Sequence, residues 1–209
     1  MPEPVSIPAD GVFLQGDLAV PADALGIVIF AHGSGSSRLS PRNNYVAHLL
    51  REKGLATLLF DLLTPEEDRN YANRFDIDLL TQRLLAATAW VQKQPSTSPL
   101  APGYFGASTG AAAALRAAAA MGETIRAVVS RGGRPDLAWD VLDKVLSPTL
   151  LIVGELDELV LELNQRAFER LRCEKALAVV PGAGHLFEEP GALDEVARLA
   201  GEWFTRHLR

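Results

Sequence analysis

The sequence has few sulfur-containing residues and no long apolar run. Its 209 residues include one cysteine, Cys173, and two methionines. A single thiol excludes an internal disulfide and any metal site built from several thiolates. We therefore expect Cys173 to be a packed structural thiol. Without an apolar stretch of about 18 residues, the sequence predicts no transmembrane helix.

Blocks of like charge and internal repeats are also absent. The formal net charge is −6, with acidic and basic residues interspersed. This pattern argues against a nucleic-acid-binding surface and against a membrane-bound protein. The first four residues lack the basic start and apolar stretch of a secretory signal, so we expect a cytoplasmic protein. With no low-complexity linker, residues 1–209 are predicted to form a single domain.

Short apolar segments alternate along the chain with segments of helical periodicity. Strands are expected near residues 26–31, 55–60, 103–106, 125–130, 149–153 and 176–180, after an extended pair near 5–7 and 12–20. Helices are expected over 43–53, 75–94, 108–121, 163–172 and 192–208, and the most irregular stretch is 64–74. Continuously apolar strands between helices predict the α/β class, with a mostly parallel central sheet flanked by helices on both faces.

Ser108 lies between an expected strand and an expected helix. Residues 106–110 read Gly-Ala-Ser-Thr-Gly, and an alanine-rich helical pattern follows. So sharp a turn strains its central residue, and it needs nearly side-chain-free residues two positions to either side, where Gly106 and Gly110 stand. The hydroxyl would be exposed at the carboxyl end of the sheet, above the positive end of a helix. These features are typical of a nucleophilic serine.

A nucleophilic serine needs a histidine as base and a carboxylate that orients the histidine. Asp157 follows the strand expected at 149–153, and His185 follows the next expected strand. Ser, Asp and His thus occur in the chain order of a known hydrolase architecture, each after a strand. Three competing carboxylates stay open: Glu155, Glu158 and Asp136.

Two backbone amides are expected to stabilise the oxyanion that forms during attack. The Thr109 amide directly follows the serine, and the Ser34 amide lies in the loop after the strand at 26–31. His32 opens this loop, and we expect it to shape the loop by hydrogen bonding instead of carrying protons. His48 and His207 fall outside the loop expected to hold the base.

Together these segments resemble the α/β-hydrolase superfamily, through residues 32–35 (His-Gly-Ser-Gly), 106–110, 154–160 and 184–185 (Gly-His). The resemblance covers nearly the whole chain. The compact size, the short connections and residues 181–187 are most similar to the dienelactone-hydrolase-like group. That resemblance implies the α/β-hydrolase fold and ester hydrolysis in general. True dienelactone hydrolases use a cysteine nucleophile where this chain has Ser108, so the lactone substrate is not implied.

The resemblance and the three residues together predict a carboxylesterase that works through an acyl-enzyme. Neither residues 62–74 nor 133–147 are long enough for a large cap domain, so we expect an open pocket for small or short-chain esters. No cofactor or metal is expected, and the expected partner is a small-molecule ester. Two alternatives stay open: a binding or regulatory module without useful catalysis, and a hydrolase of amide, thioester or carbon–carbon bonds. The oligomeric state is also open, a homodimer included.

Several residues are candidates for substrate contacts. Four arginines in loops at the catalytic end could bind a carboxylate or phosphate, or pair with nearby acids: Arg38, Arg42, Arg131 and Arg134. Apolar walls are expected from Trp139, Phe187, Leu63 and Leu186, with ordinary core packing as the alternative. Arg131 and Phe187 are the predicted substrate-binding residues.

Overall fold

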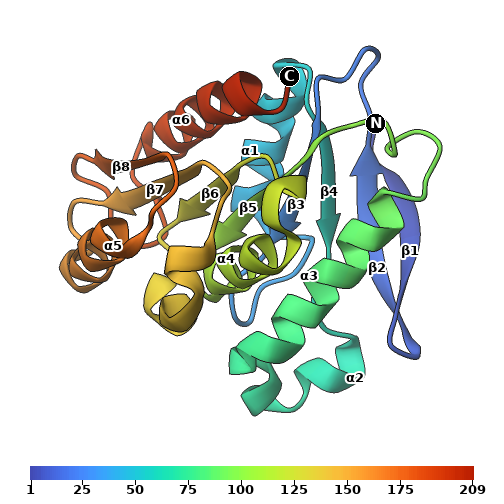
Figure 1. Ribbon diagram of the computed structural model, residues 1–209, viewed down its shortest axis with the longest axis horizontal. Coiled ribbons are helices and arrows are strands. Elements are labelled where there is room, and N and C mark those ends of the chain that lie inside the picture. Colours follow the sequence, from blue (N-terminus) through green and yellow to red (C-terminus); the bar gives the residue numbers. More distant parts are fainter.

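The computed structural model describes residues 1–209 and contains one eight-stranded sheet in the order β1-β2-β4-β3-β5-β6-β7-β8 (Figure 1). The strands are β1 (Glu3–Ala9), β2 (Val12–Ala19), β3 (Ile27–Ala31), β4 (Ala56–Phe60), β5 (Pro102–Ala107), β6 (Val128–Arg131), β7 (Thr149–Gly154) and β8 (Lys175–Val180). The α-helices are α1 (Pro41–Glu52), α2 (Pro65–Asp68), α3 (Ile77–Val91), α4 (Thr109–Met121), α5 (Glu158–Arg170) and α6 (Ala192–His207). Shorter 3₁₀ helices cover Tyr71–Phe75, Gly122–Thr124 and Pro135–Lys144.

Six neighbouring strands of the sheet, β3 to β8, run parallel, whereas β1 and β2 form an antiparallel hairpin that joins β4. The carboxyl ends of the six parallel strands therefore meet at one edge, where ligands bind in open α/β sheets. The predicted fold class, a mostly parallel sheet without a large cap, is confirmed.

Helices cover both faces of the sheet and form two separate apolar cores. Helices α3, α4 and α5 pack on one face, in a cluster that includes Leu84, Ala113 and Ala167. Helices α1 and α6 pack on the other face, with Leu50 and Phe204 in the second cluster. Strands β3, β4, β5, β6 and β7 are buried along their whole length, as their continuous apolar sequences predict.

The expected element boundaries differ from the structure in two regions near the site. Helix α5 begins at Glu158, whereas the sequence pattern predicted a start at 163. The pattern missed the first turn because the buried face includes the polar Asn164 between Val160 and Ala167, which hides the apolar periodicity. The stretch expected to be irregular contains α2, because Thr64 caps it with its side chain and Pro65 stands at the first helical position.

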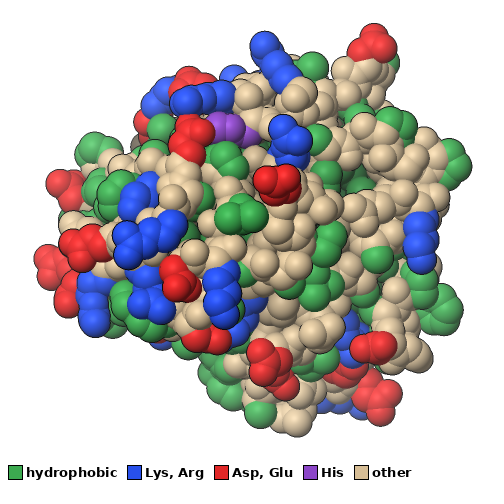
Figure 2. Space-filling view, in the orientation of Figure 1, with side chains coloured by type: hydrophobic (Ala, Val, Ile, Leu, Met, Phe, Trp, Pro, Cys, Tyr) green, Lys and Arg blue, Asp and Glu red, His purple; other side chains and the backbone are tan.

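Basic and acidic side chains lie beside one another on the face that Figure 2 shows, without a block of one sign. Ion pairs between neighbouring side chains include those of Arg198 with Glu195 and Glu202 on α6. None of the helices combines the length and hydropathy that crossing a membrane would require.

Candidate active site

Ser108 occupies a strained turn between β5 and α4. Its backbone angles are φ 50° and ψ −120°, in a region that non-glycine residues rarely adopt. A Cβ atom at Gly106 would lie 2.4 Å from the Ala111 Cα, and one at Gly110 would lie 2.1 Å from the Ala31 carbonyl oxygen. The two glycines therefore allow the close approach of chain segments that holds Ser108 at the start of α4.

Asp157 and His185 face each other across two neighbouring loops. The His185 Nδ1 lies 2.6 Å from the Asp157 Oδ2, and the Asp157 side chain is 15% exposed against 41% for His185. A proton on Nδ1 donated to Asp157 leaves Nε2 free to accept one. Two of the three competing carboxylates have other partners, since Asp136 accepts two bonds from Arg134 and Glu155 accepts the Gly182 amide.

Backbone contacts join the loop that carries Asp157 to the loop that carries His185. The Leu156 amide donates to the Ala183 carbonyl at 2.9 Å. A Cβ on Gly154 would meet the same carbonyl oxygen at 2.3 Å, so the two loops touch through bare backbone. Glu189 accepts the Gly184 amide at 3.0 Å, which fixes the chain next to His185. Sequence reasoning missed Glu189, because a surface glutamate carries no distinguishing pattern.

The two predicted oxyanion donors lie beside each other, but one already has an acceptor. The Ser34 amide donates to the Thr109 hydroxyl at 3.0 Å, and the two hydroxyls are 2.8 Å apart. The Ser34 hydroxyl donates in turn to the Arg74 carbonyl at 2.9 Å. As the first residue of α4, Thr109 has an N–H with no acceptor inside the helix.

His32 supports the loop that contains Ser34. Its Nδ1 lies 2.9 Å from the Gly33 carbonyl oxygen, and its Nε2 accepts the Leu62 amide at 3.0 Å. Burial lowers the pKa of His32 below its usual 6.5, and the Gly33 carbonyl opposes this effect. A neutral ring with both nitrogens occupied matches the structural role expected from the sequence.

A cavity of about 310 Å³ brings most of the predicted residues together. The predicted residues that line it are Ser34, Arg42, Ser108, Thr109, Arg131, Arg134, His185 and Leu186. Ser108 and His185 form no hydrogen bond with each other in this structure. Such contacts are often long in the absence of substrate and tighten when it binds. Asn43 and Phe75 also line the cavity, and no motif or spacing in the sequence marks them as site residues.

The four loop arginines differ in how their charges are compensated. Arg38 pairs with Asp61 at 2.7 Å, and Arg134 pairs with Asp136 at 2.8 Å. Arg42 has only a 3.5 Å contact with the exposed Glu188. Arg131 forms no ion pair, although it is buried.

Three residues that were expected to form apolar walls of the cavity do not line it. Phe187 is 1% exposed and lies under the Arg131 guanidinium, 5.7 Å from ring centre to Cζ, instead of lining the cavity. Its positive φ of 54° turns the side chain into the core. Leu63 is buried in the core near α3, and Trp139 stacks with Arg166 and Arg170 away from the cavity.

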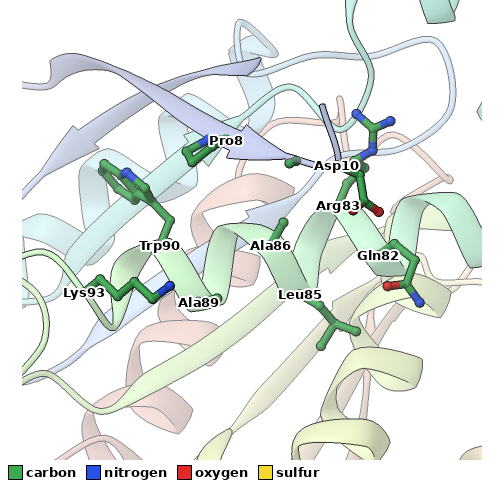
Figure 3. Close-up of a pocket in the computed structure, with 10 residues that line it drawn as sticks. Pro8, Asp10, Gln82, Arg83, Leu85, Ala86, Ala89, Trp90 and Lys93 are labelled. Carbon is green, nitrogen blue, oxygen red and sulfur yellow. The ribbon is translucent and has the colours of Figure 1, made fainter. Parts of the chain in front are cut away.

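A second concavity, of about 370 Å³, lies between β1 and α3. Figure 3 shows Pro8 on one side, with the Trp90 side chain of α3 extending toward it and Lys93 further along the chain. We call it the α3 groove. None of the predicted site residues lines it.

The fold and the arrangement of Ser108, Asp157 and His185 at one sheet edge define an α/β hydrolase. Residues 14–207 match the model of the dienelactone hydrolase family, and the chain belongs to that family.

Solved structures agree with this assignment. A crystal structure of a dienelactone hydrolase from Anabaena variabilis has a TM-score of 0.97 and is 56% identical, over 100% of this chain and 99% of that chain. An esterase domain from a Rhodothermus marinus protein is 20% identical and has a TM-score of 0.81, over 99% of each chain, and shares the fold.

A curated protein of Mycobacterium tuberculosis, described as a putative phosphoribosyl transferase, is 61% identical over 206 residues. The match covers 99% of this chain and 46% of that protein, so this chain spans about half of the relative's length.

Proposed function

We propose that this protein is a serine carboxylesterase that acts on small or short-chain esters. The observation that carries the proposal is the 2.6 Å contact between His185 Nδ1 and Asp157 Oδ2 beside a cavity that also contains the strained Ser108. A strained serine next to an oriented histidine supports nucleophilic catalysis. Membership in a hydrolase family supports the same reaction class.

In the proposed mechanism, the Ser108 oxygen attacks the ester carbonyl while His185 Nε2 takes the hydroxyl proton. The tetrahedral oxyanion accepts hydrogen bonds from the Thr109 amide and from the Ser34 amide, which exchanges the Thr109 hydroxyl for the oxyanion. His185 then protonates the leaving alcohol, and an acyl-enzyme remains. Water, deprotonated by the same histidine, releases the acid, and Asp157 stays ionised throughout.

The cavity volume supports the proposed substrate size. A space of about 310 Å³ is at the small end of ligand pockets. Phe75, Ala107 and Leu186 are the hydrophobic residues of its lining, and they supply apolar surface for a short acyl chain.

The proposal is tested with p-nitrophenyl acetate, butyrate and octanoate, comparing the wild type with Ser108→Ala. We expect turnover that falls with chain length and a loss on the order of a million-fold in the variant. A fluorophosphonate probe should label the wild type alone. Equal, negligible rates in both proteins without labelling would favour the alternative of a module without useful catalysis.

The name of the curated relative suggests a second candidate, transfer of a phosphoribosyl group. That name describes a protein about twice as long as the matched region. Within this chain, the serine, histidine and aspartate at one cavity favour hydrolysis. Turnover of esters that disappears in Ser108→Ala would assign hydrolysis to this part.

A further inference from the structure

Arg131 is a buried cation without a counter-ion in the cavity that contains Ser108. It has 7% of its surface exposed, its Nε is buried with no hydrogen-bond partner, and its only polar side-chain contact is a 3.5 Å bond from Nη2 to the Asn43 Oδ1. Burial, and then the charge of Arg42, lowers its pKa to about 10, so it stays charged at neutral pH. A buried charge is normally paired or bound to a ligand.

Two further features make the same side of the cavity positive. Arg42 lines the cavity, and its Nε is also buried without a hydrogen-bond partner. The amino-terminal turn of α1, a helix of 12 residues, contributes Ser40, Arg42 and Asn43 to the lining and contains no acidic residue. Pro41 has no amide hydrogen and the Asn43 amide donates to the Ser40 hydroxyl, so the Arg42 amide is the free donor of this turn. The helix dipole adds to its attraction for an anion.

We propose that Arg131, Arg42 and the first turn of α1 bind a phosphate-like dianionic group carried by the substrate. This inference rests on the proposed esterase function and specifies its substrate class. The exposed Glu188 compensates Arg42 only weakly, at 3.5 Å, so a carboxylate on the substrate would leave part of the charge of the two guanidinium groups unneutralised. A phosphate carries a charge of about −1.5 to −2 and three acceptor oxygens, so it can satisfy both arginines and a helix amide at once.

The position of Arg131 indicates where the dianion lies relative to the reacting bond. Arg131 pairs with Ala107 in the sheet register, and the Ser108 amide donates to the Arg131 carbonyl at 3.2 Å. The guanidinium therefore extends from a residue adjacent to the nucleophile. Arg131 and Ser108 line the same cavity of about 310 Å³, so one small substrate can place an anionic group at the first and an ester carbonyl at the second.

A structural role for Arg131 must be separated from substrate binding. Its guanidinium lies over the Phe187 ring, two residues after His185. If Arg131 only supported this loop, its replacement would lower turnover of all esters in parallel. If it binds a dianion, replacement lowers turnover of the dianionic ester selectively.

The test uses three p-nitrophenyl esters whose acyl chains differ only at the end: 3-phosphonopropanoate, succinate and butyrate. After subtraction of the Ser108→Ala background, we expect wild-type kcat/KM to be highest for the phosphonate. In Arg42→Gln and Arg131→Gln, the ratio of phosphonate to butyrate kcat/KM should fall by roughly 10-fold to 100-fold, as expected for lost charge-assisted hydrogen bonds. Arg131→Lys should restore part of that ratio.

Arg198→Gln is the matched control, because it removes one positive charge from an exposed side chain of α6. It should leave the ratio unchanged. Arg42 is about one-third exposed, so Arg42→Gln carries the test if Arg131→Gln fails to fold. Binding of inorganic phosphate, measured by calorimetry, should weaken in both variants and not in the control.

Four results would overturn the inference: a wild-type preference for butyrate, a preference for succinate over the phosphonate, equal losses on all three esters, or phosphate binding unchanged by both variants. Its failure is distinguishable from failure of the esterase proposal. Butyrate turnover that depends on Ser108, without any preference for the phosphonate, would support the esterase proposal and contradict the anion subsite. Absence of all ester turnover would refute the esterase proposal. Absence of phosphate binding would separately refute the anion subsite.

Discussion

The cavity at Ser108 and the α3 groove have similar volumes, about 310 and 370 Å³, but they differ in how their charged groups are compensated. The buried arginine of the groove, Arg83, pairs with Glu67 at 2.7 Å. Arg131 in the cavity has no carboxylate partner. Both arginines leave one buried nitrogen unpaired, so the missing carboxylate is the informative difference.

The two concavities also differ in how the chain builds them. The groove is lined by one strand with its following turn and by one helix (Figure 3). The cavity collects side chains from the loops after several parallel strands, which are distant in sequence. A concavity with convergent, uncompensated polar groups is therefore a better guide to a functional site than its volume.

The largest expected effect is a loss of turnover on replacing Asp157, which contacts the histidine of the cavity. We expect Asp157→Asn to lower kcat by roughly 10⁴-fold, because the amide favours the wrong tautomer of His185. Turnover of p-nitrophenyl acetate measures the loss. Asp136→Asn tests the competing carboxylate, and a larger loss there than in Asp157→Asn would contradict the assignment.

The next effect concerns the turn that holds Ser108. Gly110→Ala should lower the free energy of unfolding by at least about 3 kcal/mol, because its Cβ would lie 2.1 Å from the Ala31 carbonyl oxygen. Gly122, at the other end of α4, has a φ of 57° and open space around it, so Gly122→Ala should cost about 1 kcal/mol. Urea denaturation measures both values, and equal losses would refute the role of close packing.

A smaller effect is expected from His32 as the pH falls. The folded-state pKa of His32 lies below its usual 6.5, because burial outweighs the opposing Gly33 carbonyl and the charges of Asp61 and Asp68. Below pH 6.5 the unfolded chain binds a proton that the folded chain does not. This group's contribution to stability is therefore complete above that pH and declines as the pH falls toward the folded-state value, by at most about 1.4 kcal/mol per pH unit.

Urea denaturation between pH 7 and pH 5 measures this decline. In His32→Gln the decline should become shallower, since the substituted side chain does not titrate. An identical slope in the two proteins would show that other groups cause the pH dependence.

The smallest effects are expected in the α3 groove. Gln82→Ala and Lys93→Ala should change kcat/KM by less than about twofold and the free energy of unfolding by less than about 0.5 kcal/mol, as usual for surface substitutions. The ester assay and urea denaturation measure both quantities. A tenfold loss of turnover in either variant would break the distinction between groove and cavity.

The sequence predicted the sheet and the strand ends well, because continuously apolar strands and glycine-rich turns leave local signals. It also put Asp157 and His185 in loops after consecutive strands, and the structure brings them into contact. Their catalytic roles stay predictions. The direction of the Phe187 side chain could not be predicted, because it depends on a positive φ at a non-glycine residue.

The compensation of the arginines was equally hidden from sequence reasoning. Arg38 lies in the loop after β3 and Arg131 is the last residue of β6, yet one meets Asp61 and the other meets no acid. Such pairing depends on how loops far apart in sequence come together. The acceptor of the Ser34 amide was hidden for the same reason, since Thr109 lies 75 residues further along the chain.

The segment between β4 and α3 contributes one wall of the cavity and is stabilised by hydrogen bonds among its own residues. Thr64 and Glu67 cap α2 reciprocally, Arg74 binds Asp68 through two hydrogen bonds, and Phe75 faces the cavity. Three hydrogen-bonded contacts join this segment to the loop after β3. Asp61 accepts bonds from Arg38, the Leu62 amide donates to His32 Nε2, and the Arg74 carbonyl accepts the Ser34 hydroxyl. The Phe75 side chain takes no part in these hydrogen bonds, so its replacement should alter substrate preference while the nucleophile, base and acid keep their positions.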